Sequence, residues 1–259
     1  MNAEALMDLL QIIVLIFIFH ETFRLIYENR GSVHLVFFAF AAACFLLSDL
    51  YWLVYDLLRP ETRMPFAANE IGEWAFFLLL AASLGSPKAD SFQNAKKEVL
   101  FTGLFVAASA GLWIGWSGEW MQDILTGIFY GYFLCTLVLR AKSERAMSDR
   151  GWRSLGIVCA VLIAVQTTIF FVPDAAKDPL DQFCYIILFA VSAVFLVRAV
   201  LSQRKDEPGK SVCHALAFLA WIETALYMSS GGYYIMAMIL SLFSFPLILL
   251  AYKKEVSAK

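Results

Sequence analysis

Long apolar stretches separated by short polar connectors recur along the whole chain. Each is close to the roughly 20 residues that an α-helix needs to cross the hydrocarbon core of a bilayer. The runs cover residues 5–27, 33–57, 66–84, 98–115, 121–140, 152–172, 180–200, 211–229 and 232–252. The third is short and polar at its start, so eight or seven spans remain as alternatives if a short run is re-entrant. The pattern predicts an all-α, polytopic transmembrane helical bundle with about nine helices.

The composition supports the same class of protein. Of the 259 residues, 61% are hydrophobic and 16% are charged, whereas soluble domains are about 45–50% apolar and about 25% charged. We therefore expect residues 1–259 to form a single integral membrane domain. It is expected to lie in the plasma or inner membrane, where its partner is the lipid bilayer. The net charge of -2 and the lack of a basic patch interleaved with aromatic residues argue against a nucleic-acid partner.

Two further patterns restrict the processing and the chemistry of the chain. Residues 1–8 contain no basic residue and carry Glu4 and Asp8, which is the wrong start for a cleaved signal peptide. The first apolar run is therefore expected to stay as a helix. All five cysteines lie in or at the edge of apolar runs, and no pair has the spacing of a zinc or redox motif, so we expect them to pack as small apolar residues. No cofactor is predicted.

The basic residues predict an orientation, because cytoplasmic loops carry an excess of Lys and Arg. With residues 253–259 assigned to the cytoplasm and nine spans alternating backwards, all but three of the 20 basic residues fall on the cytoplasmic side. The exceptions are Arg59, Arg63 and Lys177. A wrong number of spans would scramble this alternation, so the pattern favours an N-terminus outside and a C-terminus inside.

Two carboxylates interrupt runs that are otherwise apolar. Asp49 begins the segment Asp-Leu-Tyr-Trp, and Glu223 lies close to the middle of its span. An ionised acid at that depth costs several kcal/mol unless it is paired, hydrated or protonated, so such residues usually have a function. The alternative is a protonated acid that hydrogen-bonds to a neighbouring helix.

The predicted orientation places other polar groups at a similar depth. Glu70 and Glu73 share one face of the third helix because they are three residues apart, although acids this close to the outer headgroups also occur without a function. Carboxylates beside Trp and Tyr, with few basic residues nearby, are suited to a proton, a metal ion or an organic amine. The candidate residues for binding a cation or a small solute are Asp49, Glu70, Glu73, Glu223, Trp52, Trp221 and Gln166.

The three histidines form a weaker candidate site. His20, His34 and His214 are all expected near the cytoplasmic ends of their helices. The segment that follows His20 lacks the second histidine of a zinc protease motif. We therefore expect no metal site, with these residues as the weak candidates for one.

Small residues recur at every fourth position in the fourth and fifth runs. Gly103, Ala107, Gly111 and Gly115 form one such series, and Gly127 and Gly131 form another. Small residues at this spacing let helix backbones approach closely in membranes. The two runs are therefore expected to form a tight hairpin through these positions.

One segment is similar to a motif of intramembrane enzymes. Gly115-Trp116-Ser117-Gly118 resembles the G-x-S-G of rhomboid proteases, in which the serine is paired with a histidine. Ser117 is expected at the outer end of its helix and His214 at the inner end of another. A nucleophile needs its base within hydrogen-bond reach, so the resemblance fails on geometry.

Three functions remain from the sequence. The leading hypothesis is a transporter or permease for a small cationic or proton-coupled solute. The second is a non-catalytic membrane sensor or accessory subunit that signals through a membrane or cytoplasmic protein partner, with the basic segment 140–153 as its docking surface. The third is an intramembrane enzyme acting on lipid or peptide through Glu70 and Glu73 or through the histidines. A non-enzymatic role is favoured because no recognised catalytic constellation accompanies these residues.

Overall fold

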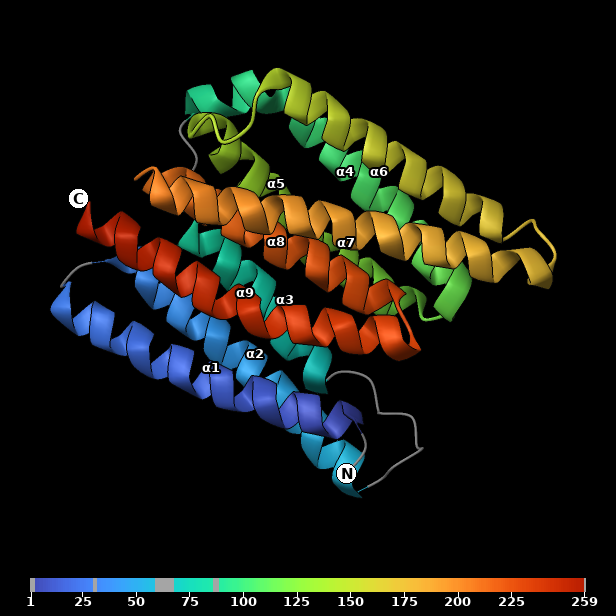
Figure 1. Cartoon of the computed structure of the whole chain (residues 1–259), viewed down its shortest axis with the longest axis horizontal. Coiled ribbons are helices and arrows are strands. Elements are labelled where there is room, and N and C mark those ends of the chain that lie inside the picture. Colours follow the sequence, from blue (N-terminus) through green and yellow to red (C-terminus); the bar gives the residue numbers. More distant parts are fainter. Residues whose placement is uncertain (1–2, 30–31, 59–67, 86–88, 259) are drawn as a thin grey trace.

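The computed structural model describes residues 3–29, 32–58, 68–85 and 89–258, and these residues form nine α-helices without a strand (Figure 1). The helices are α1 (Ala3–Glu28), α2 (Val33–Leu58), α3 (Ala68–Ser83), α4 (Ala89–Ser117), α5 (Trp120–Ser143), α6 (Asp149–Ile169), α7 (Asp174–Arg204), α8 (Pro208–Met228) and α9 (Gly231–Ser257). The predicted all-α fold is confirmed.

Eight of these helices are long and apolar enough to cross a bilayer. The exception is α3, whose 16 described residues begin at Ala68, in agreement with the short third run of the sequence. The starts of α4 at Ala89 and α7 at Asp174 differ most from the predicted ones, because polar turns extend these helices beyond their apolar segments. The chain is a multi-pass membrane protein.

Neighbouring helices of the described chain form a closed circuit. In order around it, the contacts run α1, α2, α3, α5, α4, α6, α7, α8, α9 and back to α1. A further contact between α5 and α8 crosses the interior of the circuit. This contact divides the bundle into one compartment bounded by α1, α2, α3, α5, α8 and α9, and another bounded by α4, α5, α6, α7 and α8.

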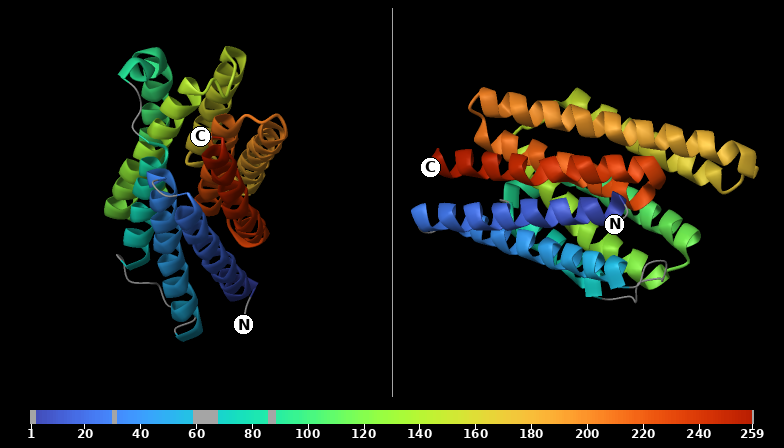
Figure 2. Two further views of the ribbon diagram at one scale, coloured as in Figure 1. Left: turned by 90° about the vertical axis from the view of Figure 1, so that its left-hand side faces the viewer. Right: turned by 60° about the horizontal axis from the view of Figure 1, so that its bottom comes forward.

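The helices run side by side with alternating direction, so the two termini lie at opposite ends of the bundle (Figures 1 and 2). We call the end at which α5, α7 and α9 finish the basic end, and the opposite one the acidic end. The helix α8 is the most buried, because it packs between α5, α7 and α9. A polar residue on α8, such as Glu223, is therefore held in the interior of the protein.

Ion pairs join several helices at the basic end. Arg140 Nη2 of α5 lies 2.8 Å from Glu255 Oε1 of α9, and Lys142 Nζ lies 2.5 Å from Glu98 Oε1 of α4. Lys254 of α9 lies 2.9 Å from Asp206 Oδ1 in the α7–α8 connection. The gathering of these cations at one end agrees with the alternation seen in the sequence. Which end faces the cytoplasm stays a prediction from the charge distribution.

The predicted α4–α5 hairpin is present, but the glycine series of α4 does not form it. A Cβ atom added at Gly131 would lie 3.0 Å from Val106 Cγ1, and one at Gly127 would lie 3.1 Å from Ala110 Cβ. No heavy atom lies within 4 Å of the corresponding position at Gly111. The glycines of α5 thus pack against branched and small side chains of α4. The small residues of α4 face away from α5. Their spacing places them on one face of the helix, but it does not indicate which neighbour that face contacts.

Candidate functional site

A cavity of about 380 Å³ opens in the compartment bounded by α1, α2, α3, α5, α8 and α9, toward the acidic end. Four carboxylates line it, each from a different helix: Asp8, Asp49, Glu73 and Glu223. We call it the acidic cavity. Its volume is in the range of about 300–1,000 Å³ that small-molecule sites occupy. The structure thus brings Asp49, Glu73 and Glu223 together, although they are far apart in the sequence.

Asp49 and Glu223 each keep one carboxylate oxygen without a protein partner. Asp49 Oδ2 and Glu223 Oε1 are buried, and no hydrogen-bond donor among the described residues reaches either atom. Most buried polar atoms in proteins are hydrogen-bonded, so each exception needs an explanation. Two such oxygens on the wall of one cavity are what a bound cation, a proton or a solute with N–H donors would satisfy.

The third helix contributes a network beside these acids. With its amide oriented to satisfy both ends, Asn69 donates to Glu70 Oε2 at 2.6 Å and accepts from the indole N–H of Trp52 at 3.1 Å. The Ser48 hydroxyl lies 3.5 Å from Glu73 Oε1. Trp52 and Glu73 line the acidic cavity, whereas Glu70 is buried next to it and contacts Asn69. Glu70 therefore supports the wall and is not part of the lining.

Aromatic side chains complete the wall at the acidic end. Trp113 and Tyr227 both line the cavity, with ring centroids 4.5 Å apart. The Tyr227 hydroxyl donates to Asp123 Oδ1, and the Ser117 hydroxyl donates to Asp123 Oδ2 at 2.6 Å. Asp123 is fully buried, and it orients Tyr227 toward the cavity. The faces of aromatic rings attract cations.

Reasoning from the sequence missed Asp8, Asp123 and Tyr227 as parts of this site. Asp8 lies in the second turn of α1 and Asp123 in the first turn of α5. Acids near the ends of apolar runs are common, so neither position carries a signal that separates it from a headgroup contact. The only hint was the scarcity of basic residues at the same end.

Two predicted site residues lie elsewhere. Trp221 lines a different cavity, on the other side of the α5–α8 contact. Gln166 of α6 contacts Met228, with its Nε2 atom 2.9 Å from the sulfur, and it lines neither cavity. Trp221 is two residues from Glu223 in the sequence, but neighbours at that spacing point to different sides of a helix.

The histidines do not converge. His20 is exposed beside Glu21, with 3.4 Å between His20 Nδ1 and a carboxylate oxygen. His34 Nδ1 lies 2.9 Å from the Ser83 carbonyl oxygen. His214 is buried between Ser202 and a backbone carbonyl. Within the described part of the chain, no group of three or more His, Cys, Asp or Glu side chains is placed to hold a metal ion.

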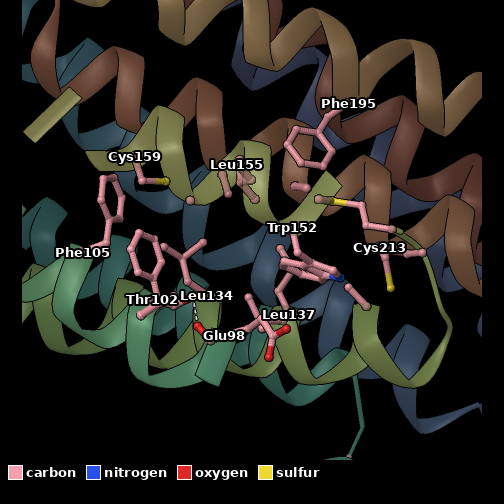
Figure 3. Close-up of a pocket in the computed structure, with 18 of the residues that line it drawn as sticks. Glu98, Thr102, Phe105, Leu134, Leu137, Trp152, Leu155, Cys159, Phe195 and Cys213 are labelled. Carbon is pink, nitrogen blue, oxygen red and sulfur yellow. Dashed lines mark hydrogen bonds between the residues drawn. The ribbon is translucent and has the colours of Figure 1, made fainter. Parts of the chain in front are cut away.

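The second cavity is a cleft of about 530 Å³ lined by α4, α5, α6, α7 and α8. Its walls are mainly apolar, with Phe105, Trp152 and Phe195 among the side chains that line it (Figure 3). At the basic end it reaches charged residues, including the exposed Lys97 and Arg153. We call it the apolar cleft.

Comparisons with protein-family models, with curated proteins and with solved structures found no similar family, protein or structure.

Proposed function

We propose that this multi-pass membrane protein is a transporter for a small organic cation or a proton-coupled solute, which binds in the acidic cavity. The observation that supports this most is the pair of buried carboxylate oxygens, Asp49 Oδ2 and Glu223 Oε1, that lack a donor on the wall of one cavity. They come from different helices, α2 and α8, so one bound cation would interact with both and couple these helices to each other.

The surroundings favour an organic cation over a metal ion. The wall combines carboxylates with the rings of Trp52, Trp113 and Tyr227, and aromatic faces attract alkylammonium groups. No set of metal ligands accompanies the acids in the described chain. A proton could occupy the same carboxylates in exchange, because acids that face one another inside a membrane commonly serve as proton-relay groups.

Uptake into proteoliposomes tests this proposal. The purified protein would be reconstituted, and uptake of labelled tetraethylammonium and of choline would be measured with and without a pH gradient. We expect Asp49→Asn and Glu223→Gln each to reduce uptake at least tenfold, since each removes a negative charge from the cavity. Asp178→Asn is the matched control, because Asp178 is an exposed acid at the same end outside the cavity.

The proposal fails if the wild-type protein moves neither these cations nor protons, or if both cavity variants keep wild-type uptake. The two alternatives make different predictions. A sensor or accessory subunit would co-purify with a stoichiometric partner protein in mild detergent. An intramembrane enzyme would convert a lipid or peptide substrate in a Glu73-dependent way. Residence in the plasma or inner membrane is part of the proposal and is tested by fractionation.

A further inference from the structure

The acidic cavity and the apolar cleft meet at one place in the bundle. Of all the described residues that line them, only Tyr130 and Thr224 line both. Tyr130 lies near the middle of α5 and Thr224 lies on α8. They therefore lie in the α5–α8 contact that divides the circuit of helices into two compartments.

Hydrogen bonds hold this partition closed. The Tyr130 hydroxyl donates to the Ala220 carbonyl oxygen at 2.6 Å and lies 2.8 Å from Thr224 Oγ1. Both bonds join α5 to α8. The Tyr130 ring also packs against Phe77, with 5.0 Å between the centroids, and its side chain is buried. The Tyr130 side chain therefore lies, together with Thr224, between the two cavities.

The cavities extend from the partition toward opposite ends. The acidic cavity reaches Asp8 and Tyr227 at the acidic end, and the apolar cleft reaches Lys97 and Arg153 at the basic end. Together they cover most of the length of the bundle, with Tyr130 between them. Transporters with a site near the membrane midplane expose it alternately to the two sides by moving such barriers.

We propose that the apolar cleft is the second half of the solute path and that Tyr130 closes it against the acidic cavity. This role rests on the transport function proposed above, and it narrows the substrate class. A solute that binds carboxylates on one side and leaves along Phe105, Trp152 and Phe195 on the other is an organic cation with an apolar body. An inorganic ion would find few polar groups along that wall.

Access of a thiol reagent to the cleft measures the partition directly. Thr102 lies on the cleft wall (Figure 3), so Thr102→Cys in a background with the five native cysteines replaced by alanine provides one reporter thiol. The probe is the trimethylammonium-ethyl methanethiosulfonate cation, which does not cross bilayers. It would be added separately to right-side-out and to inside-out vesicles.

In the parent protein we expect the reporter to react from the basic-end face and at least tenfold more slowly from the acidic-end face. Tyr130→Ala should raise the acidic-face rate at least tenfold. Tyr130→Phe keeps the ring but loses both hydrogen bonds and should raise it about threefold or more. Tyr185→Ala is the matched control, because Tyr185 is another buried tyrosine that donates to a backbone carbonyl but lines neither cavity. It should leave the rate unchanged.

An unchanged basic-face rate verifies that a variant is folded. If the basic-face rate of Tyr130→Ala differs from that of the parent, the acidic-face rate of Tyr130→Phe is used to test the role of Tyr130. The role of Tyr130 is overturned if the folded variants keep the parent acidic-face rate, or if the parent already reacts equally from both faces. The assay requires no transported solute. If the Tyr130 variants change the labelling rate but the protein takes up no solute, only the transport function is refuted. If the protein takes up solute but the Tyr130 variants do not change the labelling rate, only the role of Tyr130 is refuted.

Discussion

Replacing Arg140 is expected to lower the free energy of unfolding of the protein, because its guanidinium joins helices at the basic end. The guanidinium lies 2.8 Å from Glu255 Oε1 and 3.0 Å from Glu144 Oε1, and it donates to the Leu84 carbonyl oxygen at 3.4 Å. These contacts tie α5 to α9 and to the end of α3. Arg140→Met would remove all of them while keeping a side chain of similar length.

The magnitude follows from the burial of the partner. At 2.8 Å and an effective dielectric constant of about 20, the Coulomb energy is about 6 kcal/mol, and desolvation offsets much of it. The side chain of Glu255 is only 9% exposed, so its charge would be left in a poorly solvated place. Removing one partner of a buried pair costs about 3–5 kcal/mol. Arg140 is 24% exposed, so water partly screens the pair. We therefore expect the free energy of unfolding to fall by about 3 kcal/mol, at the lower end of that range.

Unfolding by SDS in mixed micelles, followed by tryptophan fluorescence, measures this loss. Arg24→Met is the matched control, since Arg24 is 63% exposed and pairs with Glu28 at 3.0 Å on the surface of α1. Such pairs contribute less than about 1 kcal/mol. The double variant Arg140→Met/Glu255→Gln should recover at least half of the lost stability, because the poorly solvated charge of Glu255 is removed together with that of Arg140. The reasoning is refuted if Arg140→Met is as stable as Arg24→Met, or if the double variant is no more stable than the single one.

Two further substitutions test the packing by the same SDS titration. Gly131→Leu should lower the free energy of unfolding by about 1–3 kcal/mol, because the leucine side chain would overlap Val106 across the α4–α5 contact. Gly111→Leu should be close to neutral, because the space beside Gly111 is open. Equal effects of the two substitutions would contradict the assigned contact. His214→Leu should cost about 1–3 kcal/mol, because it leaves the Ser202 hydroxyl and a carbonyl of the α5–α6 connection without their partner. His214→Gln keeps a hydrogen-bond donor and should therefore lose less stability than His214→Leu. A larger loss for His214→Gln would show that packing of the ring, and not hydrogen bonding, stabilises this site.

The sequence alone determined the class of the protein and the order of its helices. Apolar runs of membrane-spanning length are a property of the chain itself, because a bilayer forces each spanning segment to satisfy its own backbone hydrogen bonds. For the same reason the weak third run was recognisable as an exception. A place for Asp49 and Glu223 on an interior wall was also to be expected, since a carboxylate within an apolar run must lie in the interior or in a cavity.

Which residues meet depends on the tertiary structure. Trp221 is close to Glu223 in sequence yet lines the other cavity, whereas Asp8 belongs to the acidic cavity although it lies in the second turn of the chain. A helix presents several faces, and hydrophobicity in a membrane does not mark which face meets a neighbour, because lipid and protein are equally apolar. The partition at Tyr130 has no sequence signal for the same reason: it depends on the approach of α5 to α8, which no local pattern encodes.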